Sequence, residues 1–486
     1  MTTSFDNAAL LDGRSFIDGA LTEGSGGVRP HVYPVTGQPR GECHYGGEAD
    51  VDEAVRAAER AFPAWRAVDP STRRGYLQRL ADLLIAHKPE FDTINAYELG
   101  VPMQVGSTAI LTAMWFQYYA GWIDKIEGHV PTLATSGGFG YTRAEPWGVI
   151  CAIVPFNGGL IDIGLKVAPA LAAGNTVVIK PSELAPFAPI LFAKLAAKAG
   201  IPDGVVNVIQ GGAAVGDALV RHRGIAKISF TGGGSTAQKV LRAAADRMTP
   251  VVTELGGKSA NIIFPDADLT RALDFSCRFP LEVQAGQNCQ KPSRLFVHRS
   301  IYKEALDRIA AIAESFVLGD PFESGTTMGP VISEPLAERC VSMVKAGVAQ
   351  GQGRLLTGGA RLGERFANGF FVKPTVVADV DNASALAQEE IFGPVLCVLP
   401  FDTEEEAVTK ANDTPFGLSA YIQTRDLATA HRVAARLEAG MVNVNGFYNV
   451  NPGSPFGGYK TSGVGREGGR WGIEEFLQVK NVFIDF

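Results

Sequence analysis

Apolar residues between positions 48 and 99 recur every three to four residues, as they do along the buried face of an α-helix. A proline directly after an aspartate, at Asp69 and Pro70, is typical of the start of a helix. The two expected core stripes consist of Val51, Val55, Ala58, Phe62 and Trp65, and of Leu77, Leu80 and Leu84. The pattern predicts helices that pack against a core.

Near residue 147 the pattern changes to short β-branched runs that alternate with helical segments. The runs are GVICAIV at 148–154, TVVIK at 176–180, VVNVI at 205–209, AKISF at 226–230 and PVVTE at 250–254. This alternation indicates a parallel sheet covered by helices on both faces. A second set predicts another α/β layer: ANIIF at 260–264, RLFVH at 294–298 and VLCVLPF at 395–401. The fold class predicted is therefore α/β.

Two further segments are β-prone, GGFGYTRA at 137–144 and QVKNVFIDF at 478–486. Unpaired strand edges tend to associate, so we expect the C-terminal segment to pair, either within the chain or with another subunit.

The composition is that of a globular protein, with 486 residues, 46% of them hydrophobic and 20% charged. This length corresponds to about three domains. The net charge of −7 argues against nucleic acid or an acidic membrane surface as a partner. No apolar run approaches the roughly 20 residues of a membrane helix, and the first residues lack a signal-peptide pattern, so a cytoplasmic chain is expected.

Six cysteines are scattered along the chain without the spacing of a zinc site, so no metal is expected. One of them, Cys289, lies in AGQNCQKPSR at 285–294, after a helix expected to reach about Gln284. A thiol in such a polar loop is a nucleophile if its pKa is lowered or a base assists. The alternative is a plain buried thiol.

The strand PVVTE ends at Glu254, just before Gly256 and Gly257. GGKS at 256–259 is not a phosphate-binding P-loop, because Val252 stands where that motif needs its first glycine. A carboxylate at a strand end in a cleft acts as a general base, although most such carboxylates cap the next helix. The sequence pattern leaves both roles open.

Two strand ends are candidates for binding a nucleotide. The run TVVIK ends at Lys180 and is followed by Ser182 and Glu183, and AKISF is followed by a glycine run at 232–234. Ligands of open α/β sheets bind beyond the carboxyl ends of the strands, where glycines admit a phosphate. The run departs from the G-x-G-x-x-G pattern, so a simple tight turn and a solvated Glu183 are the alternatives.

The motifs together resemble the NAD(P)-dependent aldehyde dehydrogenase superfamily. They are PFN at 155–157, LKVAPALAAGNTVVIKPSE at 165–183, SFTGG at 229–233, TELGGKSANIIFPDADL at 253–269, GQNC and SR within 286–294, EEIFGPV at 389–395 and PFGGYKTSGVGREGG at 455–469. The resemblance covers nearly the whole chain in the expected order. It implies the aldehyde dehydrogenase fold: a Rossmann-like NAD-binding domain of residues 1–126 and 147–257, an α/β catalytic domain of 258–460, and a small β oligomerisation element of 127–146 and 472–486.

The resemblance also implies how the reaction proceeds. Cys289 matches the nucleophile, which forms a thiohemiacetal and then a thioester. Its backbone N–H and the Asn157 side chain would hold the oxyanion. Glu254 matches the general base that activates water for hydrolysis and is typically missing from the CoA-acylating branch. Lys166 and Glu467 match positions near a proton relay.

For the cofactor, the resemblance implies NAD, with some tolerance of NADP through Ser182. Glu183 should accept the ribose hydroxyls of NAD and repel a 2′-phosphate. The residues matching the family's cofactor site are Val154, Pro155, Phe156, Lys180, Ser182, Glu183, Gly212, Gly216, Phe230, Gly232, Gly233, Leu255, Glu390 and Phe392.

Three departures from the family pattern stand out. Gly158, Gly159 and Leu165 replace larger or more rigid residues, which predicts a wide tunnel and a bulky or long apolar aldehyde. Gly233 lacks a hydroxyl often found at the pyrophosphate. Lys291 follows the nucleophile where small residues are common, and we expect it to face solvent rather than to assist the thiolate.

Several alternatives remain at this stage. They are a CoA-acylating enzyme, a semialdehyde dehydrogenase, and a catalytically idle relative that keeps the fold. The family pattern implies a homodimer or homotetramer that acts on a small-molecule aldehyde.

Overall fold

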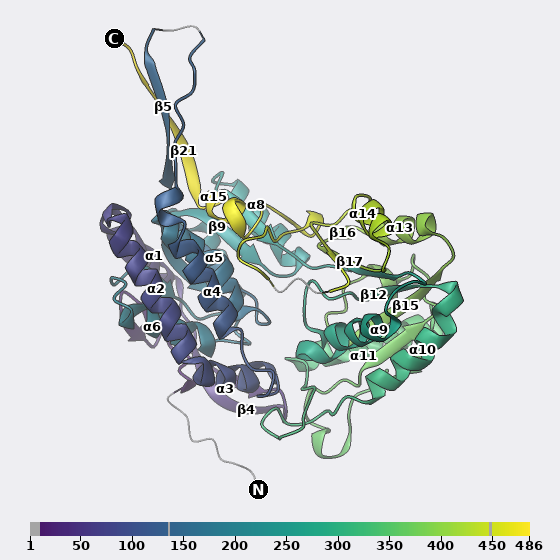
Figure 1. Cartoon of the computed structure of the whole chain (residues 1–486). Helices are drawn as coiled ribbons and strands as arrows, with labels where there is room; N and C mark the ends of the chain where they lie inside the picture. The colour runs from purple at the N-terminus through teal and green to yellow at the C-terminus, as the bar shows by residue number, and fades with distance from the viewer. Residues whose placement is uncertain (1–9, 135–136, 447–449) are drawn as a thin grey trace.

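The computed structural model describes residues 10–134, 137–446 and 450–486. Two α/β bodies lie side by side, and a two-stranded arm projects from the first of them (Figure 1). This mixed architecture confirms the predicted fold class.

An eight-stranded sheet forms the centre of the first body. Its order is β2-β1-β8-β7-β6-β9-β10-β20, and the five strands from β8 to β10 run parallel. These five correspond to the five apolar runs between 148 and 254. The strands are β1 (Ser15–Ile17), β2 (Ala20–Thr22), β6 (Val149–Ile153), β7 (Thr176–Lys180), β8 (Val206–Val208), β9 (Ile225–Thr231), β10 (Val251–Glu254) and β20 (Gly463–Val464).

Helices cover both faces of this sheet. They are α1 (Glu48–Ala67), α2 (Pro70–Ala86), α3 (Lys88–Leu99), α4 (Ala109–Ala120), α5 (Gly159–Ala173), α6 (Phe187–Lys198), α7 (Ala213–Arg221) and α8 (Gly234–Ala245). Alternate residues of β6 enter two separate apolar clusters, Ile150 on one face and Cys151 on the other. Asp69 caps α2 as predicted, because its carboxylate accepts the backbone N–H of Ser71 at 3.1 Å. Of the expected stripes only Phe62 is not fully buried.

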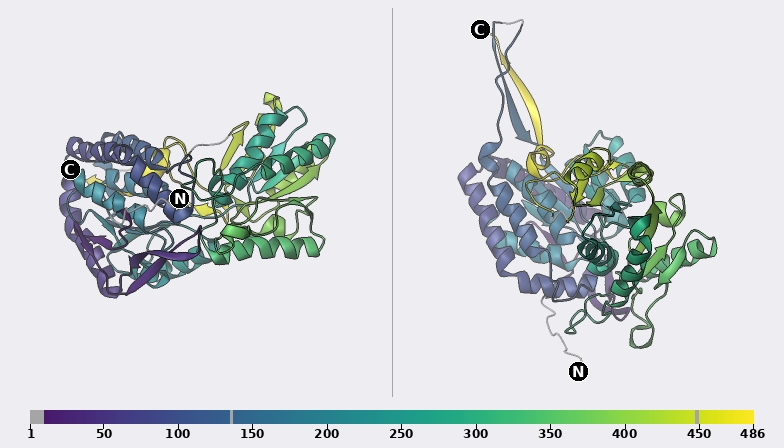
Figure 2. Two further views of the ribbon diagram at one scale, coloured as in Figure 1. Left: turned by 90° about the horizontal axis from the view of Figure 1, so that it is seen from below. Right: turned by 45° about the vertical axis from the view of Figure 1, so that its right-hand side comes forward.

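The second body contains a seven-stranded sheet of order β13-β14-β15-β12-β11-β17-β18, parallel except at β13. Its strands are β11 (Ala260–Ile263), β12 (Arg294–His298), β13 (Arg354–Thr357), β14 (Thr375–Ala378), β15 (Val395–Phe401), β17 (Ser419–Gln423) and β18 (Met441–Val444). Its helices are α9 (Leu269–Cys277), α10 (Arg299–Glu314), α11 (Glu334–Ala349), α12 (Ala385–Gln388), α13 (Glu404–Asn412) and α14 (Leu427–Ala434). Figure 2 shows both bodies from two further sides.

The helix expected to reach Gln284 ends earlier. The α-helix α9 stops at Cys277, and a π-helical turn, Arg278–Glu282, follows it. Pro280 lies in this turn, and a proline in a helix interior removes a backbone hydrogen bond. The chain therefore approaches Cys289 in irregular conformation.

The arm consists of β5 (Phe139–Pro146) and β21 (Leu477–Ile484), which pair antiparallel within the chain. The β-prone C-terminal segment thus finds its partner at 139–146. The remaining elements are the pair β3 (Val28–Tyr33) and β4 (Gln38–His44), the pair β16 (Phe416–Gly417) and β19 (Tyr459–Lys460), and helix α15 (Gly469–Glu474). Among the described residues, no helix combines the length and apolar character that crossing a membrane requires.

Candidate active site

A cavity of about 610 Å³ lies between the two bodies, and Asn157, Glu254 and Cys289 all line it. Asn157 lies in the loop between β6 and α5, Glu254 ends β10, and Cys289 lies in the loop before β12. Two of these residues come from the first body and one from the second. The fold therefore brings together three predicted catalytic residues that are far apart in the sequence.

Cys289 is partly exposed, whereas the other five cysteines are buried. Burial of the sulfur within the protein raises the pKa of the Cys289 thiol, and the carboxylates of Asp162, Glu390 and Glu254 raise it further. The thiol is therefore protonated at neutral pH before ligands bind. A base is needed to make it a nucleophile.

Glu254 is only 3% exposed, and neither of its carboxylate oxygens has a hydrogen-bond partner among the described residues. Burial, and next the carboxylate of Glu467, raise the pKa of the Glu254 carboxyl well above its ordinary value. Gly457, with φ of +153°, passes close by: a Cβ there would lie 2.8 Å from Glu254 Oε1. A carboxyl with a raised pKa and free oxygens can exchange a proton with water or substrate.

Lys166 and Glu467 form a buried ion pair beside Glu254. Lys166 Nζ lies 2.5 Å from Glu467 Oε1, and both side chains are almost fully buried. Burial alone would lower the pKa of Lys166, but Glu467 and Asp162 outweigh it and raise that pKa. The lysine is therefore charged, and Glu467 Oε2 lacks a hydrogen-bond partner among the described residues. The two predicted relay residues lie together, as the sequence suggested.

Asn157 is held by a residue from the other side of the cavity. Gln284 Nε2 donates a hydrogen bond to the Asn157 carbonyl oxygen at 3.1 Å. Gln284 and Ala285 have φ of +49° and +50°, a conformation that non-glycine residues seldom adopt. This strained turn places the loop before Cys289 against the loop that carries Asn157.

The candidate adenosine site lies at the carboxyl end of β7. Lys180 Nζ lies 3.5 Å from Glu183 Oε2, and the Glu183 side chain is 42% exposed. Ser182 Oγ accepts the backbone N–H of Leu184 at 3.3 Å. A Cβ at Gly212 would lie 4.0 Å from Glu183 Oε1, which brings the start of α7 to the same place.

The glycines near α7 and α8 leave open space. A Cβ at Gly216 or Gly233 would meet nothing within 4 Å among the described residues. At Gly232 a Cβ would lie 2.7 Å from the ring of Phe230. Backbone N–H groups at the start of α8 are thus accessible to a phosphate.

The candidate nicotinamide-ribose residue, Glu390, accepts the backbone N–H of Gly257 at 3.0 Å. Burial raises the pKa of its carboxyl. The ring of Phe392 packs edge-on against Phe156 at 5.8 Å. Leu255 lines the main cavity, and Val154 donates its backbone N–H to the Lys180 carbonyl. Pro155 follows Val154 in the chain. The segment 154–156 therefore runs from the adenosine end of the site toward the Cys289 end.

Two sequence-based expectations need correction. Lys291 does not face solvent: it is 3% exposed and donates a hydrogen bond to the Gly393 carbonyl, because the turn after Cys289 folds inward against the 390–393 loop. Burial lowers the pKa of Lys291 to about 8. The space beside Gly158 is not part of a widened tunnel, because a Cβ there would lie 2.1 Å from Asp162 Oδ2.

Asp162 itself was not singled out in the sequence. It lines the cavity on the first turn of α5, five residues after Asn157 and four before Lys166. The i, i+4 spacing from Lys166 was the available signal, since it places both on one face of a helix.

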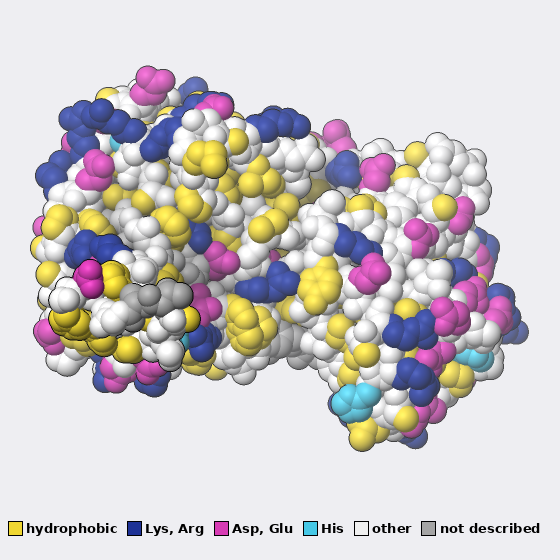
Figure 3. Space-filling model, turned by 90° about the horizontal axis from the view of Figure 1, so that it is seen from above, with side chains coloured by type: hydrophobic (Ala, Val, Ile, Leu, Met, Phe, Trp, Pro, Cys, Tyr) yellow, Lys and Arg dark blue, Asp and Glu magenta, His cyan; other side chains and the backbone are white. Residues whose placement is uncertain are grey.

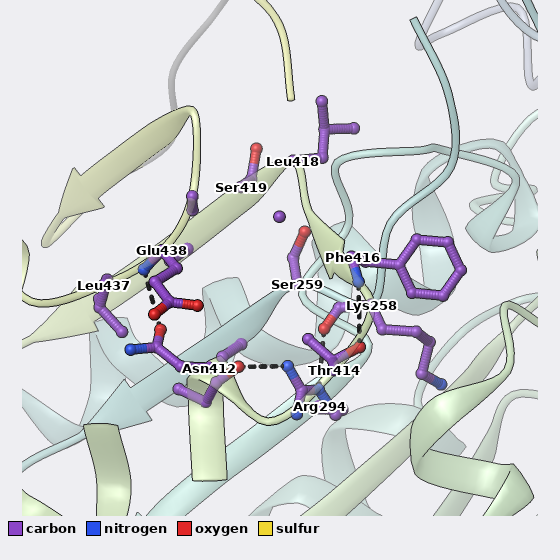
Figure 4. A pocket seen from close by; sticks show the side chains of 15 residues that line it. Lys258, Ser259, Arg294, Asn412, Thr414, Phe416, Leu418, Ser419, Leu437 and Glu438 are labelled. Atoms are coloured by element: carbon purple, nitrogen blue, oxygen red, sulfur yellow. Dashed lines mark hydrogen bonds between the residues drawn. The ribbon is translucent and has the colours of Figure 1, made fainter. Parts of the chain in front are cut away.

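A second, small pocket lies beneath β17 (Figure 4). Arg294 lines it and donates hydrogen bonds to the carbonyl oxygens of Lys258 and Ala411. The guanidinium is thus satisfied by the backbone, and its role here is structural.

The comparison with family models decides what kind of site this is. The model described as the aldehyde dehydrogenase family matches residues 22–482. The chain belongs to the aldehyde dehydrogenase family.

Similar proteins in this aldehyde dehydrogenase family are alike over nearly their full lengths. Betaine aldehyde dehydrogenase of Cereibacter sphaeroides is 39% identical over 96% of this chain and 96% of its own. Human retinal dehydrogenase 2 is 40% identical over 95% of this chain and 89% of its own. The NAD⁺ complex of an aldehyde dehydrogenase from Bacillus cereus is 37% identical, covers 98% of both chains and has a TM-score of 0.95. The predictions of an NAD-dependent aldehyde dehydrogenase and of NAD(P) as its cofactor are confirmed.

Proposed function

We propose that this aldehyde dehydrogenase oxidises its substrate to a free carboxylic acid, with Cys289 as the nucleophile and Glu254 as the base for hydrolysis. One observation carries the proposal: the Cys289 thiol, Asn157 and the unpaired carboxyl of Glu254 line a single cavity.

In this mechanism Cys289 reacts as its thiolate: Sγ bonds to the aldehyde carbon, and the thiol proton passes to water in the cavity. The Cys289 backbone N–H and the Asn157 amide stabilise the oxyanion of the thiohemiacetal. NAD bound at this site would supply the acceptor for the hydride on that carbon, which would leave a thioester on Cys289. Glu254 then takes a proton from water, whose oxygen attacks the thioester carbon and releases the Cys289 thiolate. Lys166 and Glu467 carry protons away from Glu254.

We propose that NAD lies along the carboxyl ends of β7 and β9. The open backbone at Gly216 and Gly233 fits a pyrophosphate, and the exposed Glu183 carboxylate fits a pair of ribose hydroxyls. Glu390 would hold the second ribose, with Phe392 and Leu255 next to the nicotinamide. Because Glu183 would repel a 2′-phosphate, kcat/KM should be higher with NAD than with NADP. Glu183→Ser should narrow that difference.

The cavity supports a substrate with a large apolar part. Its apolar lining includes Val101, Leu111, Ile161, Leu165, Phe275, Phe279, Val283 and Phe456. A space of about 610 Å³ is ample for a chain of eight carbons or an aromatic ring. We therefore expect a higher kcat/KM for octanal or benzaldehyde than for acetaldehyde, and equal values would contradict the assignment.

We propose that the NAD-binding domain comprises 1–126 and 147–257, the catalytic domain 258–460, and the oligomerisation element 127–146 and 472–486. The arm exposes apolar side chains at Phe139, Val479 and Phe483, and Figure 3 looks down on it. Their exposure supports a homodimer or homotetramer, and we propose separately that this protein acts in the cytoplasm. Val479→Asp should lower the mass measured by light scattering.

The roles of Cys289 and Glu254 are tested by two substitutions. Cys289→Ala should abolish NADH formation at 340 nm while NAD still binds in calorimetry. Glu254→Gln should give a burst of NADH near one equivalent per site, followed by slow turnover, because hydrolysis loses its base. Wild-type turnover by either variant would refute its role, and acyl-CoA formed from added CoA instead of free acid would refute the hydrolytic outcome.

A further inference from the structure

Asp162 is a carboxylate of the cavity to which the proposed mechanism gives no task. It is 8% exposed and lines the same cavity as Cys289 and Asn157. Its carboxylate is the first charged group among those that raise the pKa of Cys289. Asp162 therefore borders the same space as the candidate nucleophile.

The local backbone makes room for this carboxylate. A Cβ at Gly158 would lie only 2.1 Å from Asp162 Oδ2, so any larger residue at 158 would displace it. The N–H of Asp162 donates to the Gly158 carbonyl at 2.7 Å, which holds it in the first turn of α5. Glycine at 158 and aspartate at 162 thus form a matched pair.

The charge around Asp162 is not balanced. Its ion-pair partner, Lys166 Nζ, lies 3.9 Å from Oδ1 but donates its hydrogen bond to Glu467 at 2.5 Å. In the described part of the chain, three carboxyl groups, those of Asp162, Glu254 and Glu467, thus interact with the Lys166 ammonium, and a second cation, Arg466, acts on Glu254 but not on Asp162. Arg278 also lines the cavity, but Asp274 and Glu282 bind it at 2.8 Å each.

Polar side chains such as Asn157, Thr231 and Gln284 line the cavity, yet the Glu254 carboxyl meets no donor among the described residues. Glu254 is nine-tenths buried, lines the cavity and has no hydrogen-bond partner among the described residues. Much of the remaining lining is apolar, and burial raises the pKa of Asp162 to about 7. A buried polar group without a full set of partners costs free energy, which a ligand recovers by donating a hydrogen bond.

We infer that Asp162 determines specificity: it selects aldehydes that carry an N–H or O–H donor, a protonated amine above all, and it disfavours aldehydes with a second carboxylate. This inference rests on the proposed function, because it assumes that the substrate reaches Cys289 through this cavity. An amphiphilic substrate follows, with an apolar part against the phenylalanines and one donor directed at Asp162.

The test compares three aldehydes of similar size: butanal, 3-aminopropanal and succinic semialdehyde. We expect wild-type kcat/KM to be at least 10-fold higher for 3-aminopropanal than for butanal, and lowest for the semialdehyde. Asp162→Leu should lower the amine-to-alkyl ratio at least 10-fold. Asp274→Asn is the matched control: it removes a cavity carboxylate that Arg278 already pairs, and it should change the ratio less than 2-fold.

Two results would overturn the inference. One is a wild-type preference for butanal, or a ratio that Asp162→Leu changes less than 2-fold. The other is an equal loss for all three substrates in a folded Asp162→Leu enzyme that still binds NAD, since Asp162 would then serve the proton relay. If Asp162→Leu does not fold, Asp162→Asn takes its place, and the same change in the ratio of kcat/KM for 3-aminopropanal to that for butanal is expected. Failure of the proposed function would look different from failure of this inference, because Cys289→Ala would then still form NADH from aldehydes.

Discussion

The buried charges around Glu254 predict how turnover depends on pH. Burial and the Glu467 carboxylate raise the pKa of Glu254, whereas the Lys166 ammonium lowers it. A general base works only when deprotonated, so hydrolysis of the thioester should fall as the pH drops below this pKa. Changing either member of the Lys166–Glu467 pair should therefore move the acid limb of the kcat profile.

The two substitutions act in opposite directions. Glu467→Gln removes a negative charge and leaves Lys166 without its 2.5 Å partner, and both effects lower the pKa of Glu254. Lys166→Met removes the positive charge and raises it. A neighbouring charge shifts a carboxyl pKa by about 1–3 units. Asp162, whose carboxylate lies 3.9 Å from Lys166, still offsets part of the lysine's charge. We therefore expect each substitution to move the pKa of Glu254 by about 1, downward in Glu467→Gln and upward in Lys166→Met.

The assay is kcat from pH 5.5 to 9, followed as NADH at 340 nm, with a pre-steady-state burst to show that hydrolysis limits turnover. Asp402→Asn is the control, because the Arg299–Asp402 pair is equally close at 2.6 Å but exposed. Its profile should match that of the wild type. Shifts of the same sign in Glu467→Gln and Lys166→Met, or none above about 0.3 units in either, would refute the electrostatic reasoning.

Three further outcomes are expected. Glu254→Gln should raise the melting temperature, and more at pH 8 than at pH 5. The pKa of Glu254 is raised in the folded state, so the wild-type protein loses stability as the pH rises through that pKa, whereas the glutamine does not titrate. An equal change in melting temperature at both pH values would contradict this. Lys291→Met should weaken NAD binding about 3–10-fold in calorimetry, since its ammonium holds the Gly393 carbonyl beside the 390–392 segment; unchanged affinity would limit Lys291 to packing. Gly457→Ala should lower kcat about 10-fold by pressing on Glu254, whereas Gly363→Ala, which has open space, should not; equal rates in both would argue against the contact.

Local patterns predicted much of the fold. The alternation of β-branched runs and helices from 148 to 254 became the parallel strands β6 to β10, and Asp69-Pro70 did start α2. These predictions succeeded because burial on one face of a helix or both faces of a sheet imposes a period on neighbouring residues. Candidate residues such as Cys289 and Glu254 were found in the same way, from their place at a loop or a strand end.

The periodic spacing of apolar residues could not predict the contacts between segments that are distant in the sequence. The burial of Lys291, the pairing of β21 with β5, and the closeness of Asp162 to Cys289 each join segments far apart in the chain. Lys291 was misjudged because a lone lysine in a polar loop carries no sign of the carbonyl that receives it. Gly158 was misjudged because the side chain that fills its space belongs to the next helical turn.

The sequence by itself thus determined most element types and the family, and it supplied the candidates for the reactive groups, because these depend on local periodicity and on ordered motifs. Only the tertiary structure decided which carboxyls share the Lys166 ammonium, in which direction burial shifts their pKa values, and that the Glu254 carboxyl has no hydrogen-bond partner among the described residues. The physical reason is that desolvation and Coulomb interactions depend on distances between packed elements, and those distances are set when the two bodies close around the cavity.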